Sequence, residues 1–115
     1  MEYVALLHGY GWTDRPGCTD LVVARVAHSV NDYATPTQRA ELLDLIPQLA
    51  AARPLPAKAW QGFIRRRGYA GPPDRAVALI TARLTSHANR VEFLRRVLAE
   101  HARLSAIVRE PVAVA

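Results

Sequence analysis

The stretch SHANRVEFLRRVLAEHARLSAIV, residues 86–108, decides the fold class. Apolar residues, together with one histidine and one serine, recur in it at alternating steps of three and four, which is the period of one helix face. These positions are Val91, Leu94, Leu98, His101, Ser105 and Val108, with Val97 and Leu104 widening the stripe. Thr85 or Ser86 supplies a cap at the start. The spacing predicts one long helix that ends at about Val108.

Working back along the chain, four further helices are predicted. Thr35, Pro36 and Gln38 form a capping box with proline at the first helical position, and Pro47 interrupts the helix that follows. An earlier helix starts at Thr19 as N-cap, with Asp20 in its first turn. The inward residues of these two helices are Val22, Val26, Val30, Tyr33, Leu42, Leu45, Ile46 and Leu49.

Two shorter helices lie between Pro56 and the last helix. One runs from Pro56 to Arg67 and stops at Gly68; the other follows the break at residues 71–74. Their inward residues are Trp60, Phe63, Ile64, Val77, Ile80 and Leu84. The chain is therefore expected to be an all-α protein, an irregular bundle of about five helices.

At 115 residues, half of them hydrophobic, the chain has the size of one domain, 1–115. Residues 1–18 are predicted to form an N-terminal segment and an ordered loop rich in Gly and aromatic residues, and residues 110–115 a frayed tail. A single cysteine, Cys18, forms no internal disulfide, and no signal peptide or membrane-spanning run is seen. We therefore expect a cytoplasmic protein without membrane association.

The N-terminal loop concentrates groups that active sites use. Its candidate catalytic residues are His8, Asp14 and Cys18, because a thiol before a helix N-terminus becomes more nucleophilic and an imidazole can act as its base. Further ligand-binding candidates in the loop are Tyr10, Trp12 and Arg15. The alternative is structural: the aromatic residues cover the bundle and Cys18 is a small buried hydrophobe.

The sequence of the same loop resembles a segment found in other proteins. The run from Trp12 to Thr19, which reads W-T-D-x-P-x-C-T, together with Asn31-Asp32 resembles a segment of small actinobacterial helical proteins. The resemblance covers about residues 5–50 and does not extend beyond Pro54. Because no activity is attached to that family, the resemblance implies a shared loop and no catalytic role.

No metal or cofactor is predicted. The four histidines include no pair four residues apart, and one cysteine does not make a zinc-finger pattern. His101 falls on the apolar stripe of the last helix, so we interpret it as a hydrogen-bonded core histidine.

The charged residues are divided unevenly between the two halves of the chain. Residues 1–52 carry three arginines against six carboxylates, whereas residues 53–115 carry twelve basic residues against four carboxylates. Candidate anion- or nucleic-acid-binding residues in this half are Arg65, Arg66, Arg67, Arg95 and Arg96. Guanidinium groups beside Trp60, Phe63 and Tyr69 suit phosphates and bases, although arginines at a helix C-terminus are also favourable for the helix itself.

Three functions follow from these features. The first is protein–protein interaction, as an adaptor or a homo-oligomeric accessory protein, because the last helix has a sustained apolar stripe flanked by charges. The second is nucleic-acid binding through the Arg-rich half. The third is a small enzyme or ligand-binding protein with its site in the loop from His8 to Cys18. Enzymatic activity is the less favoured expectation.

Overall fold

The computed structural model describes residues 19–109, and all regular structure within that range is helical. The α-helices are α2 (Leu21–Tyr33), α3 (Pro36–Glu41), α4 (Ile46–Ala51), α5 (Gln61–Arg65), α6 (Pro73–Arg83) and α7 (His87–Arg109). Two 3-10 helices, η2 (Leu42–Leu45) and η3 (Ala57–Trp60), lead into α4 and α5. Joined in this way, the described helices group into five segments, which confirms the all-α bundle. The predicted N-terminal loop and C-terminal tail lie outside the described residues.

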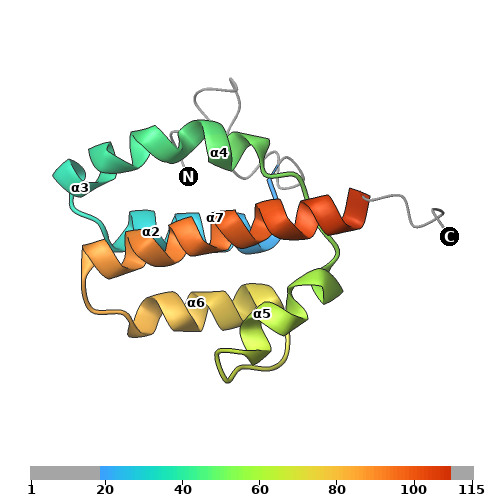
Figure 1. Cartoon of the computed structure of the whole chain (residues 1–115). Coiled ribbons are helices and arrows are strands. Elements are labelled where there is room, and N and C mark those ends of the chain that lie inside the picture. Colours follow the sequence, from blue (N-terminus) through green and yellow to red (C-terminus); the bar gives the residue numbers. More distant parts are fainter. Residues whose placement is uncertain (1–18, 110–115) are drawn as a thin grey trace, which may run out of the picture.

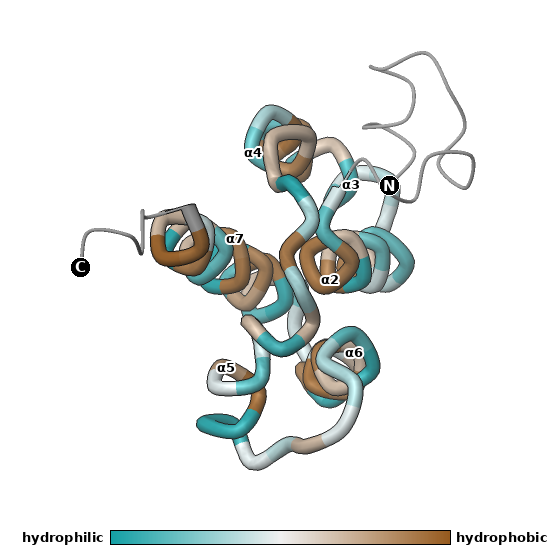
Figure 2. Tube along the Cα trace, turned by 90° about the vertical axis from the view of Figure 1, so that its right-hand side faces the viewer, coloured by the Kyte–Doolittle hydropathy of each residue, from teal (hydrophilic) through white to brown (hydrophobic). Residues whose placement is uncertain are grey.

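Helix α2 lies at the centre of the bundle. It packs against α6 and α7, and more lightly against α4. Figure 2 shows these three helices around α2, and Figure 1 shows α7 running across the molecule as its longest element. Short helix α5 packs beside α6. The apolar faces predicted for α2, α6 and α7 are therefore the faces at which these helices meet.

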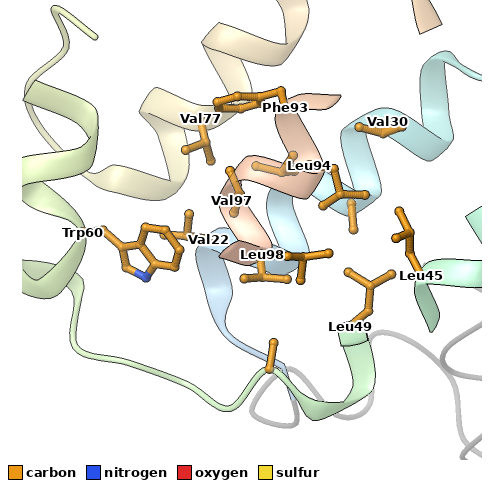
Figure 3. Close-up of a cluster of buried hydrophobic side chains, with 14 of the residues drawn as sticks. Val22, Val30, Leu45, Leu49, Trp60, Val77, Phe93, Leu94, Val97 and Leu98 are labelled. Atoms are coloured by element: carbon orange, nitrogen blue, oxygen red, sulfur yellow. The ribbon is translucent and has the colours of Figure 1, made fainter. Parts of the chain in front are cut away.

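The core contains residues of every described helix except α3. Its fully buried side chains include Trp60 of η3, Leu42 of η2, and Leu94 and Val97 of α7. Figure 3 shows Leu94, Val97 and Leu98 in the middle of this cluster. Phe93, which the stripe did not include, is also buried and stacks on Phe63 with ring centroids 6.2 Å apart.

The sequence pattern predicts two further inward residues, and for both of them this prediction is wrong. Val108 is 51% exposed and Tyr33 is 49% exposed. Each lies at the C-terminal end of its helix, where the periodic stripe continues but the side chain is left about half exposed. The period therefore extended the buried face by about one helical turn too far.

The start of α2 also differs from expectation. Asp20, and not Thr19, is the N-cap: its Oδ1 accepts hydrogen bonds from the backbone N–H groups of Val22 and Val23 at 2.9 and 3.2 Å. Its own N–H donates to the carbonyl of Ala52 at 2.8 Å, which ties the start of α2 to the end of α4. Asp20 is 1% exposed, so this cap is part of the core.

The capping box at residues 35–38 is confirmed. The Thr35 hydroxyl accepts from the Gln38 N–H at 3.2 Å, and the Gln38 side chain accepts from the Thr35 N–H at 2.9 Å. Pro47 stands in the first turn of α4, where its missing donor costs no helical hydrogen bond. The predicted interruption is therefore a restart through η2, with Leu42, Leu45, Ile46 and Leu49 all buried.

The stop signal at Gly68 is confirmed as well. Gly68 has a φ of 82°, a conformation in which glycine has no Cβ penalty. The N–H of Tyr69 donates to the carbonyl of Ile64 and that of Gly68 to the carbonyl of Arg65, which together make a Schellman motif. The predicted helix over residues 56–67 is thus η3 followed by α5. Ser86 caps α7, accepting from the Asn89 N–H at 3.1 Å.

We predict that Asp20→Ala lowers the free energy of unfolding by about 3 kcal/mol or more, because it removes a cap and leaves buried donors unpaired. Urea denaturation followed by circular dichroism measures this loss. Asp44→Ala, which removes an exposed aspartate of η2, is the matched control and should change stability by less than about 0.5 kcal/mol. Equal losses in the two variants would contradict the role assigned to Asp20.

Candidate functional site

A groove of about 790 Å³ lies between the end of α4, the linker to η3 and the C-terminal half of α7. Most of its lining is apolar. The lining residues are Gln48, Ala51, Ala52, Arg53, Pro54, Leu55, Arg95, Leu98, Ala99, His101, Ala102, Ser105 and Val108. The α7 members recur every three or four residues, so they form one continuous strip along about four turns of helix.

The linker wall of the groove is held by Asp20. Its Oδ2 accepts hydrogen bonds from the N–H of Leu55 at 2.8 Å and from the indole Nε1–H of Trp60 at 3.3 Å. Together with the two bonds to α2, this gives the carboxyl group four donors and no acceptor, the arrangement that suits an ionised carboxylate. The linker therefore has a fixed position relative to α2 and the core.

His101 joins the opposite wall to the same linker. Its Nε2 is 2.7 Å from the carbonyl oxygen of Arg53, and because a carbonyl only accepts, Nε2 carries the proton. Its Nδ1 is 3.4 Å from the Ser105 hydroxyl, and its ring lies 6.3 Å from that of Trp60. At 8% exposure, His101 is the hydrogen-bonded core histidine that the sequence predicted. Its contacts fix the width of the groove.

The charges on the groove have one sign. Arg53 and Arg95 line it, both are exposed, and no carboxylate is among the lining residues. No hydrogen bond or ion pair within residues 19–109 engages the guanidinium of Arg95. The groove therefore combines an apolar floor with cationic edges.

The five predicted anion-binding arginines have different surroundings in the structure. Arg66 pairs with Glu100 at 3.4 Å and Arg96 with Glu92 at 3.4 Å, whereas Arg95 lies at the groove. The guanidinium of Arg67 covers the ring of Phe63 at 3.8 Å and donates to the Phe63 carbonyl at 3.2 Å. Arg65, at the end of α5, is exposed. Arg95 is thus at the groove, whereas Arg66 and Arg96 lie near Arg67.

Glu100 organises the basic side of α7. It accepts hydrogen bonds from Arg103 and Arg66, and the Arg103 hydrogen bond is the largest cause of a lowered pKa for this carboxyl, which partial burial opposes. Burial, followed by repulsion from Arg66 and Arg96, lowers the pKa of Arg67. Arg66 and Arg96 are therefore both close enough to act on Arg67, while Glu100 pairs with Arg66 and Arg103 and attracts Arg67.

The described residues contain no group of three or more His, Cys, Asp or Glu side chains that could hold a metal ion. They also include no helix with the length and apolar character needed to span a membrane. The loop candidates His8, Tyr10, Trp12, Asp14, Arg15 and Cys18 lie outside the described residues, so the enzymatic hypothesis for that loop stays a prediction.

The chain matches no protein-family model, no curated protein and no solved structure. The resemblance to small actinobacterial helical proteins through residues 12–19 is therefore still a proposal, and functional inference depends on the geometry of the bundle.

Sequence reasoning missed the groove. Among its residues it had singled out only Arg95 as a site, and it had assigned Leu98, Ser105 and Val108 to the core. A signal was present in Ala99 and Ala102, two small residues next to the apolar stripe of a long helix, because small side chains leave room above the helix surface. Their partner wall, residues 51–55, is brought to them only by the tertiary fold.

We predict that Glu100→Gln destabilises the protein at pH 7 and that this destabilisation shrinks as the pH is lowered from about 4 toward 3. The folded-state pKa of Glu100 lies below its ordinary value, so its contribution is present above the unfolded pKa of about 4.3 and is lost as the pH falls through the folded value. The stability gap is the difference between the urea midpoints of the unchanged protein and of Glu100→Gln, measured at a series of pH values. Glu92→Gln, at an exposed ion pair, is the control and should show almost no gap at either pH. A gap for Glu100→Gln that is equally large at pH 3 would contradict the assignment.

Proposed function

We propose that this protein is a protein–protein interaction module whose groove between α4 and α7 binds an amphipathic, acid-bearing helix of a partner protein. The observation that carries the proposal is the groove itself: an apolar strip along about four turns of α7, bounded by Arg53 and Arg95 and lined by no carboxylate. Laying the apolar face of a helix into such a groove is a recurrent mode of peptide recognition.

The shape of the groove supports a helical occupant. The strip on α7 is formed by residues such as Leu98, Ala99 and Ala102, and the facing wall by Ala51 and Leu55. Alanines at these positions permit close approach of another backbone, and the leucines supply apolar contact. The walls are already fixed by Asp20 and His101, so binding requires little ordering of this protein.

Charge supports an acidic partner and argues against a second copy in this groove. An occupant with Glu or Asp beside its apolar face meets Arg53 and Arg95 at the edges. The lining of the groove holds two arginines and no carboxylate, so a second copy that pairs symmetrically through the same groove brings no carboxylate to Arg53 or Arg95. A heterologous partner is therefore favoured over a homo-oligomer, and the cytoplasm is its proposed compartment.

Binding of a probe helix tests the function directly. The probe is a synthetic 18-residue peptide (about five helical turns) with Leu on one face and Glu on the other, titrated into ¹⁵N-labelled protein. We expect backbone amide shifts at residues 48–55 and 95–108, and a weaker complex at high salt because the edge contacts are ionic. A matched peptide with Lys in place of Glu should bind at least about tenfold more weakly.

Two variants make the test specific. Ala102→Glu places a charge and bulk on the groove floor at an exposed position, so it should weaken the Leu/Glu peptide by about tenfold or more without loss of fold. Ala82→Glu makes the same change at an exposed position of α6 outside the groove and should leave binding within about twofold. Equal binding of the Glu and Lys peptides, or unchanged binding by Ala102→Glu, would overturn the proposal.

A further inference from the structure

A second concavity lies on a different side of α7. It has a volume of about 400 Å³ and is bounded by the N-terminal half of α7, the end of α6 and the segment that follows α5. Its lining residues are Arg67, Tyr69, Ile80, Arg83, Leu84, Asn89, Glu92, Phe93 and Arg96. Three guanidinium groups face one carboxylate there, so the pocket has an excess of two positive charges.

Two of these guanidinium groups are already oriented. Arg83 donates to the Tyr69 hydroxyl at 2.6 Å, and Arg67 is held against the ring of Phe63 at 3.8 Å and bonded to the Phe63 carbonyl. A guanidinium has five N–H donors, so each retains donors for a ligand. The rotamers are fixed without the cations being neutralised, which lowers the ordering cost of binding an anion.

The third guanidinium is weakly engaged. Arg96 pairs with Glu92 at 3.4 Å, and the two side chains are 65% and 60% exposed, so the pair contributes little and can rearrange. Asn89 adds an amide donor at the same rim. Ile80, Leu84, Tyr69 and Phe93 also line the pocket. The guanidinium carbon of Arg83 lies 5.4 Å from the centre of the Tyr69 ring, and that of Arg67 lies 5.9 Å from the centre of the Phe93 ring. The pocket therefore sets cationic groups beside aromatic and aliphatic ones, a combination that suits an anion joined to an apolar or planar group.

We propose that this pocket binds a phosphate monoester attached to a planar group, as in a nucleoside monophosphate. The excess of two positive charges matches the charge of a phosphate monoester, about −1.5 to −2 at pH 7. Arginine forks bind phosphate oxygens in pairs, and the aromatic and aliphatic side chains accept the base. The same chemistry is offered by a free nucleotide and by the 5′-phosphate at the end of a single nucleic-acid strand.

The test is isothermal titration calorimetry of the full chain with AMP, adenosine and inorganic phosphate at low salt. We expect AMP to bind at least about tenfold more tightly than adenosine or inorganic phosphate, because the arginines and the apolar lining of the pocket both contribute. A 5′-phosphorylated oligoadenylate separates the two sources. If the oligoadenylate binds more tightly than AMP, the site is assigned to a strand end. If it binds more weakly than AMP, the site is assigned to the free nucleotide.

Arginines of α6 and α7 supply the matched variants. Arg83→Gln and Arg96→Gln should each weaken AMP by about tenfold, because each removes a charge-assisted contact. Arg95→Gln removes the same charge from the adjacent position but lines the other groove, so it should change AMP binding by less than about twofold. Circular dichroism melts confirm that each variant is folded. Absence of binding at millimolar AMP, equal affinity for inorganic phosphate, or an equal loss in Arg95→Gln would overturn the proposal.

Discussion

One buried carboxylate connects the parts of this bundle that are distant in sequence. Asp20 accepts from two N–H groups of α2, from Leu55 in the linker and from the indole of Trp60, while its own N–H bonds to Ala52. A charge with 1% exposure is tolerated because each lone pair that faces the protein has a donor. Without these bonds, the linker loses its direction relative to α2, and with it one wall of the groove.

Helix α7 supplies the other wall and divides the surface. Because successive residues turn by about 100° around a helix, Arg95 and Arg96 point to different sides. Arg95, Ala99 and Ala102 face the groove toward α4, whereas Arg96 and Phe93 face the smaller pocket toward α6. One long helix can therefore present two concavities of different chemistry, one mainly apolar and one cationic, without either depending on the other for its walls.

Local signals in the sequence predicted the local structure well. The capping box at Thr35, the restart at Pro47 and the stop at Gly68 each depend on a few adjacent residues and are all confirmed. The errors have tertiary causes. Asp20 replaces Thr19 as cap because its second oxygen also reaches Leu55 and Trp60, partners 35 and 40 residues away. The groove was missed for the same reason: its walls meet only after folding, and no spacing within α7 identifies Ala51 or Leu55.

The arginines show how folding divides the basic half of the sequence into separate groups. Glu100 takes Arg66 and Arg103 into internal pairs, so these cations are partly neutralised. Arg53 and Arg95 border the groove, and Arg67, Arg83 and Arg96 line the pocket. Each of these two groups lies at a concavity of limited size. This suits the two occupants proposed above, a helix with acidic flanks for the groove and a single phosphate for the pocket.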